Sequence, residues 1–424
     1  MLPYFIYFGL PVFLLVIGFP VFLILLVTSI VAILTIAGTP PETLQIYMFG
    51  SLDNFPLMAV PFFVLAGEFM AQGGVARRII AMVMAFVGGI CGSLGLTTVA
   101  ASELFGAMSH TAIGSVVAMG RMLYPALKGA GYDDRFAVGL IASSGAIAVI
   151  IPPSIAAILY AVSAEQSAVS LFTAGILPSI LIGIIDGVFV LTYARVRRVP
   201  RGSRAHWRGM LRASKEAIWA LGTLVVIFGG IYGGVFTPTE AAGVAVVYSM
   251  FVTMAIYREV DIARCWKILV DAAFLISQIL LIVTSAGIYS WLLTTSGIPQ
   301  QIVNTINALH LAKWELLLSL NCGLLIAGSF LEPPAAILIL TPLLLPIVTA
   351  VGVNPIHFGI IVTVNLSIGM YTPPFGLNLF ACQAIFNAPL GRIYRGVSPF
   401  LLLNFLALLI ITYVPEISTV LLHP

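Results

Sequence analysis

The chain has 424 residues, of which 60% are hydrophobic and only 8% are charged, and its formal net charge is +3. Soluble domains carry about 25% charged residues, so this composition excludes a water-soluble globular protein and predicts an all-α polytopic membrane protein. Apolar stretches of the roughly 20 residues that cross a bilayer recur along the chain, which indicates about ten to twelve membrane segments. The five histidines and four cysteines are scattered, so we expect neither a metal centre nor a disulfide framework.

Residues 1–60 are largely apolar and do not begin with a basic segment. A signal peptide has a basic start and an apolar core of only about 7–15 residues. We therefore expect residues 1–60 to stay in the membrane as scaffold segments.

A double proline, Pro152–Pro153, interrupts a later apolar run. Proline donates no backbone N–H and breaks a helix, and irregular backbone at membrane depth is tolerated only where it is buried in protein or lines a cavity. We therefore predict a broken membrane helix at residues 136–163, preceded by a re-entrant hairpin at residues 100–125 with its tip at Ser109–Thr111. These elements belong to a first repeat at residues 61–195. The alternative is a proline kink that serves packing only.

A basic stretch follows the first repeat, because eight of the 19 Lys and Arg residues lie between Arg195 and Lys215. Short loops rich in Lys and Arg stay in the cytoplasm. We expect residues 196–215 to be a cytoplasmic linker and residues 216–270 to be scaffold helices. A nucleic-acid-binding patch is the weaker interpretation because long apolar segments flank the stretch, so we expect no nucleic-acid partner.

A second double proline, Pro373–Pro374, follows the first after 221 residues, and the same offset aligns Pro125 with Pro346 and Gly131 with Gly352. These proline and glycine positions, shared at one constant offset, indicate an internal duplication. The second repeat is expected at residues 271–395, with a hairpin at 320–347, a tip at 331–334 and a broken helix at 357–384. Residues 396–424 are expected to form a C-terminal membrane helix.

The basic residues predict that the two repeats have opposite orientations. The connector of the first repeat carries Arg121, Lys128 and Arg135, whereas the matching connector of the second repeat carries no Lys or Arg. The two connectors should then lie on opposite sides of the membrane. Inverted repeats with helices broken at matching positions are typical of secondary transporters, in which freed carbonyls hold a cation and half-helix N-termini face an anion. Small and hydroxylated residues around both breaks supply oxygen ligands that suit Na⁺.

Several stretches, in family order, carry a resemblance to known transporters: "LFGAMSHTAIGSVVAMG", "GYDDRFAVGLIASSGAIAVIIPPSIAAILYAV", "GSFLEPPAAILILTPLLLPI" and "NLSIGMYTPPFGLNLFA". With them, the chain resembles the large membrane subunit of the tripartite ATP-independent periplasmic (TRAP) transporters, the DctM-like or SiaM-like permeases. The resemblance spans roughly residues 45–400. It implies an elevator-type fold, in which a mobile part holds the two hairpins and the two broken helices.

The resemblance also implies how the protein works. Transport would be driven by a Na⁺ gradient, and an organic-acid substrate would be delivered by a periplasmic binding protein. A small four-helix membrane subunit would complete the complex as a separate polypeptide, in the bacterial inner membrane. Because the chain has no phosphate-binding G-x-x-x-x-G-K-[ST] motif and no cluster of acid–base residues, we expect no enzyme activity. The alternative function is a stand-alone Na⁺/dicarboxylate symporter of related architecture.

The tips and breaks supply three sets of candidate site residues. We expect the substrate to be bound by Ser109, His110, Thr111, Pro153, Ser154, Glu332, Thr372 and Pro374. We expect one Na⁺ site at Ser109, Thr111, Ser144, Gly145 and Pro152. We expect a second Na⁺ site at Gly328, Glu332, Gly369, Met370 and Thr372.

Some of these residues depart from the family pattern or have other interpretations. His110–Thr111 replaces the usual Gly-Ser-Ser-like tip, and Glu332 stands where Asp is more usual. His110 either contacts an anion, carries a proton or packs as a hydrogen-bonded residue. Glu332 serves either the site or the surface that meets the binding protein. Glu240 opens an apolar helix after Thr237, which favours a helix-capping role.

Overall fold

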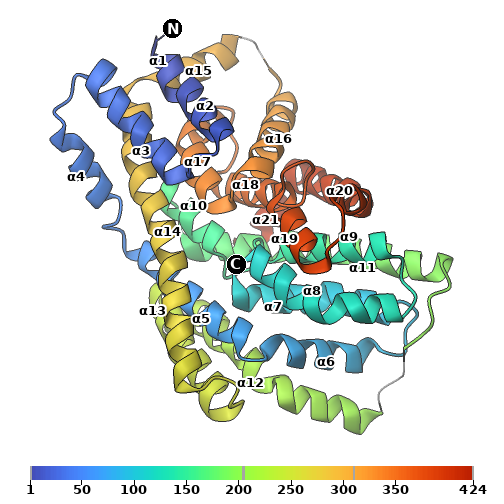
Figure 1. Ribbon diagram of the computed structural model, residues 1–424. Coiled ribbons are helices and arrows are strands. Elements are labelled where there is room, and N and C mark those ends of the chain that lie inside the picture. Colours follow the sequence, from blue (N-terminus) through green and yellow to red (C-terminus); the bar gives the residue numbers. More distant parts are fainter. Residues whose placement is uncertain (1, 203–205, 309–310, 423–424) are drawn as a thin grey trace.

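The computed structural model describes residues 2–202, 206–308 and 311–422, which fold almost entirely into helices (Figure 1). Within these residues, one isolated bridge joins Cys91 and Arg201 in antiparallel register. Seven described helices are long and apolar enough to cross a membrane by length and composition: Phe55–Gln72, Ala168–Val196, Trp207–Tyr232, Pro238–Ile256, Ile262–Thr295, Pro333–Ala350 and Leu390–Tyr413. Shorter apolar helices account for the other predicted segments.

Nine short and medium helical segments precede the first hairpin in the described part of the chain. They are α1 (Leu2–Tyr4), η1 (Phe5–Gly9), α2 (Leu10–Ile17), α3 (Val21–Ala32), η2 (Ile33–Ala37), α4 (Glu42–Gly50), η3 (Phe55–Met58), α5 (Ala59–Gln72) and α6 (Val75–Val87). The 34-residue helix α14 (Ile262–Thr295) is about 51 Å long and contacts α3, α4, α5 and α17 along one side of the molecule (Figure 1).

The first repeat contains the expected hairpin and the expected broken helix. Helices α7 (Ser93–Ser109) and α8 (Ala112–Gly129) are the hairpin arms, joined at His110–Thr111. Helices α9 (Asp134–Ile147) and α10 (Ile155–Ser163) are the two halves of the broken helix, and residues 148–154 between them are not helical. Asp133 caps the start of α9 and Ser154 caps the start of α10.

The second repeat has the same order of elements. Its hairpin arms are α16 (Lys313–Phe330) and α17 (Pro333–Ala350), and its broken helix comprises α18 (Pro355–Gly369) and α19 (Leu377–Phe386). The remaining helices are α11 (Ala168–Val196), α12 (Trp207–Tyr232), α13 (Pro238–Phe251), η4 (Val252–Ile256), α15 (Ile298–Ala308), α20 (Leu390–Tyr413), α21 (Glu416–Thr419) and η5 (Val420–Leu422). The hairpin arms begin at Ser93 and Lys313, before the predicted starts at residues 100 and 320. The domain limits and the opposite orientation of the repeats stay predictions.

The two repeats meet between their broken helices. The Ser367 hydroxyl donates to the carbonyl oxygen of Ala146 at 2.6 Å, and the two residues are 221 positions apart, which is the offset of the double prolines. A residue that contacts its own counterpart lies near the axis that relates two repeats. Helices α9 and α18 therefore cross close to that axis.

Each hairpin packs against its own broken helix through small residues. A Cβ atom added to Gly106 would lie 2.6 Å from the Cα atom of Ala148, and one added to Gly369 would lie 2.5 Å from the carbonyl carbon of Gly328. Gly106 and Ala148 are the counterparts, at the 221-residue offset, of Ala327 and Gly369. Close approach of backbones at small residues is how membrane helices pack, so this contact is a repeated feature of the fold.

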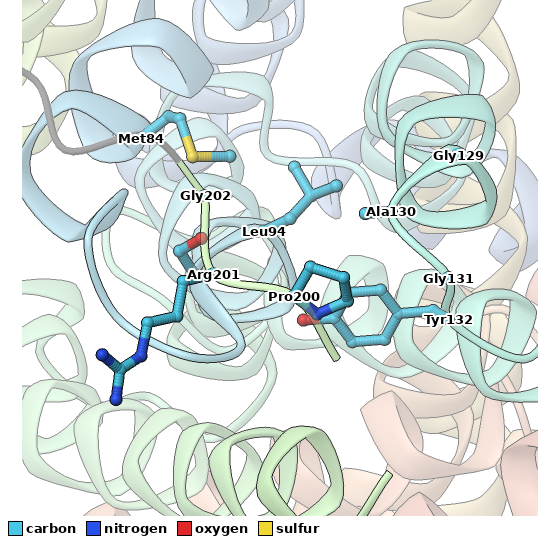
Figure 2. A pocket seen from close by; sticks show the side chains of 10 residues that line it. Met84, Leu94, Gly129, Ala130, Gly131, Tyr132, Pro200, Arg201 and Gly202 are labelled. Carbon is cyan, nitrogen blue, oxygen red and sulfur yellow. The ribbon is translucent and has the colours of Figure 1, made fainter. Parts of the chain in front are cut away.

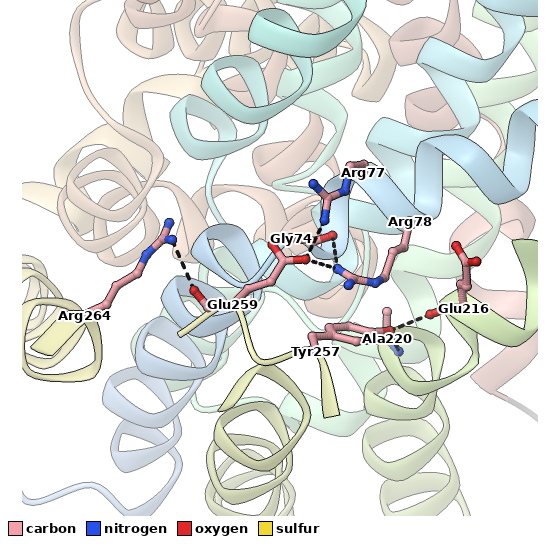
Figure 3. A network of polar contacts seen from close by, with 8 residues as sticks. All are labelled: Gly74, Arg77, Arg78, Glu216, Ala220, Tyr257, Glu259 and Arg264. Carbon is pink, nitrogen blue, oxygen red and sulfur yellow. Dashed lines mark hydrogen bonds and ion pairs between the residues drawn. The ribbon is translucent and has the colours of Figure 1, made fainter. Parts of the chain in front are cut away.

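Two arginines at the start of α6, Arg77 and Arg78, form an ion-pair network (Figure 3). Their guanidinium groups lie 2.6 and 2.7 Å from one oxygen of Glu259, which lies just before α14. The guanidinium carbon of Arg78 also stacks 3.6 Å from the ring centre of Tyr257, whose hydroxyl donates to the Glu216 carbonyl oxygen on α12. These contacts connect α6, α12 and the start of α14.

The glycine contact between α16 and α18 gives a test of this packing. We expect Gly369→Ala to lower stability by about 1–3 kcal/mol, because the new methyl group would overlap the backbone of Gly328. Gly323→Ala on α16 is the matched control, since nothing lies within 4 Å of its added Cβ. Thermal melting of the purified variants in detergent measures the effect. Equal melting temperatures for the two variants would contradict the close contact.

Candidate functional site

The tip of the first hairpin contacts the first break directly. The Nδ1 atom of His110 lies 2.8 Å from the carbonyl oxygen of Pro153, and the His110 ring packs edge-on against Phe63 with centres 5.0 Å apart. His110 is buried, and its backbone is in the left-handed region with φ of 56°. A Cβ atom at Gly67 would lie only 2.7 Å from the Ser109 carbonyl oxygen, so α5 covers this tip. The geometry of His110 is that of the hydrogen-bonded packing residue, and its role toward an anion stays a prediction.

Two more of the predicted site residues, Ser109 and Ser154, form hydrogen bonds at the first tip and the first break. The Ser109 and Ser115 hydroxyls lie 2.9 Å apart across the hairpin tip. The Ser154 hydroxyl donates to the Val149 carbonyl oxygen and accepts from the Ala157 N–H, so it bridges the break. Both bonds stay within the first broken helix, which shows how the protein replaces backbone hydrogen bonds that the prolines remove.

Ser144 differs from its neighbour Ser143 in an informative way. Both side chains are completely buried in the last turns of α9. The Ser143 hydroxyl donates to the Leu140 carbonyl oxygen at 3.1 Å, whereas the Ser144 hydroxyl has no hydrogen-bond partner among the described residues. A buried polar atom without a partner is costly, so the Ser144 oxygen is suited to bind a ligand.

The second hairpin tip meets the second break through aromatic residues. The rings of Phe330 and Phe375 pack with centres 4.9 Å apart. The Thr372 hydroxyl donates to the Ile368 carbonyl oxygen at 2.8 Å, and the Pro374 carbonyl oxygen accepts from the Tyr394 hydroxyl at 2.8 Å. Gly328, Gly369 and Met370 are buried together at this junction.

Glu332 lies at the second tip as the residue before α17 and is exposed, and Pro374 is also exposed. The side chain of Glu332 does not cap its helix. The structure therefore places Glu332 where it is accessible, whereas its counterpart Thr111 at the first tip is half-buried. Glu240, by contrast, forms a capping box with Thr237, as the capping interpretation expected.

Sequence reasoning missed three buried asparagines around the second break. Asn378 donates to the Ala142 carbonyl oxygen at 3.1 Å, and Asn365 donates to the side-chain oxygen of Asn321 at 2.7 Å. The side-chain oxygens of Asn365 and Asn378 have no hydrogen-bond partner in the part of the chain that the structure describes. Asn378 also connects the second repeat to α9 of the first. Polar residues inside otherwise apolar membrane segments are a functional signal, and that signal was present in the sequence.

A cavity of about 380 Å³ lies elsewhere, at the opposite end of the hairpin (Figure 2). It is lined by Ser93 and Leu94 at the start of α7, by the α8–α9 connector and by the segment after α11 that contains Arg201. Helix α7 is about 26 Å long, so this cavity is remote from His110 and from the first break. It contains none of the predicted site residues.

Comparison with solved structures identifies the fold as that of a known transporter. The chain superposes on the YdaH transporter of Alcanivorax borkumensis, a structure described as having an unusual topology. The TM-score is 0.67, the superposition covers 95% of this chain and 97% of that one, and sequence identity is 16%. At this identity the similarity shows a shared fold and nothing more specific.

Sequence comparison shows the family. Residues 8–417 match the family described as "Tripartite ATP-independent periplasmic transporter, DctM component". The C4-dicarboxylate TRAP transporter large permease protein DctM of Pseudomonas aeruginosa is 42% identical over 89% of this chain and 88% of its own length. The protein of the same name from Rhodobacter capsulatus is 36% identical over 97% of both chains. The isethionate TRAP transporter permease protein DctMQ of Oleidesulfovibrio alaskensis is 37% identical over 97% of this chain and 65% of its own length.

The chain therefore belongs to the DctM family and is a TRAP transporter large permease subunit, a multi-pass membrane protein. Permeases of this family work with a small membrane subunit and a substrate-binding protein.

The contact between His110 and Pro153 gives a test of the first junction. We expect His110→Asn to lower the melting temperature, because it loses the hydrogen bond but keeps a residue type that tolerates positive φ. His110→Ala loses both the hydrogen bond and the tolerance of positive φ. Its free energy of unfolding should therefore be lower by about a further 1 kcal/mol. Asn387→Ala, an exposed position with φ of 50°, measures the backbone cost alone. A His110→Ala effect no larger than that of Asn387→Ala would mean that the hydrogen bond contributes nothing.

Proposed function

We propose that this chain is the large permease of a Na⁺-coupled system that imports a small organic acid, with C4-dicarboxylates as the first candidates. The observation that carries the proposal is the pair of hairpin tips, each in contact with a broken helix, in a chain of the DctM family. The substrate class is suggested by the P. aeruginosa relative at 42% identity, whose name specifies C4-dicarboxylates. Relatives named for isethionate and for ectoine have 37% and 36% identity, so uptake of several acids needs to be compared.

The helix N-termini at the tips and breaks support binding of an anion. Backbone N–H groups in the first turn of a helix point outward and attract negative charge. Helix α8 starts after Thr111 with no side-chain cap, so its first N–H groups are open to a ligand. Helix α17 starts with Pro333 and Pro334, which lack N–H groups, and follows the carboxylate of Glu332. We therefore place the substrate carboxylate nearer the first tip, with Ser109 and Thr111 as contacts.

The distribution of oxygen atoms supports two Na⁺ sites. In the first, the unpartnered hydroxyl of Ser144 lies in the last turns of α9, close in sequence to Gly145 and Pro152. In the second, Gly328, Gly369 and Met370 surround the end of α18, where backbone carbonyls leave the helix, and Thr372 and Glu332 lie nearby in the chain. Carbonyl, hydroxyl and carboxylate oxygens are the ligands of hard cations.

The proposed mechanism is of the elevator type. The hairpins α7–α8 and α16–α17 and the broken helices α9–α10 and α18–α19 would move as one unit against the scaffold, carrying substrate and Na⁺ across the membrane. The contacts between the repeats, from Ser367 to Ala146 and from Asn378 to Ala142, support a single moving unit. The location would be the bacterial inner membrane, with a four-helix small subunit and a periplasmic binding protein as partners.

Uptake into proteoliposomes tests the whole proposal. The complex of this chain and its small subunit would be given an inward Na⁺ gradient and a binding protein loaded with a labelled acid. We expect uptake only when both Na⁺ and the binding protein are present, and we expect a C4-dicarboxylate to be taken up best. Uptake that does not need the binding protein would instead assign the chain to the stand-alone symporters. Uptake without a Na⁺ gradient would contradict the proposed coupling to Na⁺.

The neighbouring serines of α9 allow a sharper test of the first Na⁺ site. We expect Na⁺ to raise the melting temperature of the wild type, because an ion that binds only the folded state stabilises it. Ser144→Ala should reduce that Na⁺-dependent rise at least severalfold while leaving the Na⁺-free melting temperature unchanged or higher, since it removes an unpaired buried hydroxyl. Ser143→Ala is the control and should keep the rise. An equal response in both variants would exclude Ser144 as a ligand.

A further inference from the structure

Two acidic residues that the proposed substrate and Na⁺ sites do not use lie inside the helical part of the fold. Asp186 is in the middle of α11 and is completely buried, and Glu103 is in the middle of α7, which packs against α11. A Cβ atom added to Gly183 would lie 1.6 Å from the Oε1 atom of Glu103. Gly183 is one turn before Asp186, and residues three apart on a helix have Cβ atoms about 5–6 Å apart. The absence of a side chain at Gly183 therefore lets the Glu103 carboxyl group approach Asp186.

A third polar residue points at the same pair. The amide nitrogen of Asn404, on α20, donates to the Oδ2 atom of Asp186 at 3.5 Å and to the Tyr371 hydroxyl at 2.8 Å. Asn404 is 1% exposed. Its Oδ1 atom is buried without a partner, as are the Oδ1 atom of Asp186 and the Oε1 atom of Glu103. Three acceptor oxygens on three helices thus lie buried together with no donor among the described residues.

No positive side chain offsets these two carboxyl groups within the described residues, where neither acid forms an ion pair. The titratable groups that face the pair are each other and the Tyr371 hydroxyl. Arg195 on α11 and Arg395 on α20 are each nine residues, or about 13 Å along the helix, from Asp186 and Asn404 respectively. On the other packed helices, Glu68 lies within α5 and Arg121 lies in the middle of α8, and the charged residues of α12 lie in its first half. The remaining charges lie near helix ends: Arg77 and Arg78 on α6, Lys128 on α8, Asp134 and Arg135 on α9, His357 on α18, and Glu416 on α21.

We propose that Glu103, Asp186 and Asn404 form a buried proton-binding site in which both carboxyl groups are protonated. A proton on a carboxyl oxygen turns an acceptor into a donor, so two protons can supply hydrogen bonds to the acceptors that now lack them. Two protons also neutralise both acids, whereas a single Na⁺ ion would leave one net negative charge in an apolar interior, which is costly. Protons come from water and return to it, and no other co-reactant is needed.

The arrangement also provides a route for the protons. Glu103 is half-buried, so its carboxyl group reaches the surface of the fold, whereas Asp186 is fully enclosed behind it. Proton exchange with the outside would therefore pass through Glu103 before it reaches Asp186. Because the site joins α7 of the first hairpin to α11 and α20, a change in its proton occupancy alters how that hairpin arm is held. This site contains none of the proposed Na⁺ ligands, although Asn404 bonds Tyr371, which lies between Met370 and Thr372. It goes beyond the proposed function.

Infrared spectroscopy of the full-length protein in lipid nanodiscs tests the site without any transport assay. At neutral pH we expect the wild type to show the C=O stretch of protonated carboxylic acids. Glu103→Gln and Asp186→Asn, which mimic the protonated side chains in shape, should each remove part of that band. Glu42→Gln, at an exposed position on α4, is the control and should leave the band unchanged. Variant spectra that overlay the wild-type spectrum would show ionised carboxylates and overturn the proposal.

Thermal melting as a function of pH gives a second, independent readout. Each deprotonation would leave an unpaired charge in the interior, so we expect the wild-type melting temperature to fall by about 2–4 °C or more as the pH rises through the titration of the site. The double variant Glu103→Gln/Asp186→Asn cannot deprotonate there and should lose this fall. A double variant that keeps the full pH dependence would contradict the proposal.

The same spectra distinguish a proton from a metal ion. If Na⁺ at neutral pH abolishes the carboxylic acid band, and the isosteric variants lose Na⁺ binding, the site holds Na⁺ and the proposal fails. If Na⁺ leaves the band unchanged, the proton assignment stands. Neither result depends on whether uptake needs Na⁺ or a binding protein, so failure here and failure of the proposed function are distinguishable.

Discussion

The fold depends on one constraint, which is that backbone polar groups freed inside a membrane must find partners within the protein. Two double prolines create such groups at matching places, and the structure shows bonds to four of the carbonyl oxygens at the breaks. The Val149 carbonyl oxygen accepts from Ser154, and the Pro153 carbonyl oxygen is bonded by His110. In the second repeat, the Pro374 carbonyl oxygen accepts from Tyr394 and the Met370 carbonyl oxygen accepts from the Asn378 N–H. These bonds connect the first hairpin tip to the first break and α20 to the second break.

The same constraint explains where small residues lie. For a hairpin to supply partners to a break, the two backbones must approach closely, and only glycine or alanine permits that approach. Gly106 faces Ala148 in the first repeat, and Gly328 faces Gly369 in the second. Similarly, Gly139 on α9 lies against the backbone of Gly396 on α20. The glycines are therefore part of the site architecture, because they bring polar atoms of different helices within reach of one another.

Most buried polar atoms at the breaks are satisfied, which makes the exceptions informative. Ser144 lacks a partner where Ser143 has one, and Asn365 and Asn378 each bond through nitrogen but not through oxygen. These atoms lie at or between the broken helices, where a transporter needs ligands for an ion. The acids Glu103 and Asp186 are a different case, because they lie on α7 and α11 and form no ion pair within the described residues.

The sequence by itself determined the membrane class, the two repeats, the hairpins and the positions of the breaks. It could do so because length of apolar segments, proline chemistry and a constant offset are local properties of a chain. It also determined the capping box at Thr237 and Glu240, since a cap needs only neighbours three residues apart.

Only the tertiary structure decided which side chains meet. That His110 bonds Pro153, that Ser367 contacts its own counterpart, and that Asp186 lies beside Asn404 are contacts across 43, 221 and 218 residues. No spacing or periodicity encodes such pairs, because they follow from how whole helices pack. Packing also decided that Ser143 has a hydrogen-bond partner whereas Ser144 lacks one among the described residues, and that Glu332 is exposed whereas Asp186 is buried. Whether a buried atom has a partner depends on all of its neighbours in space.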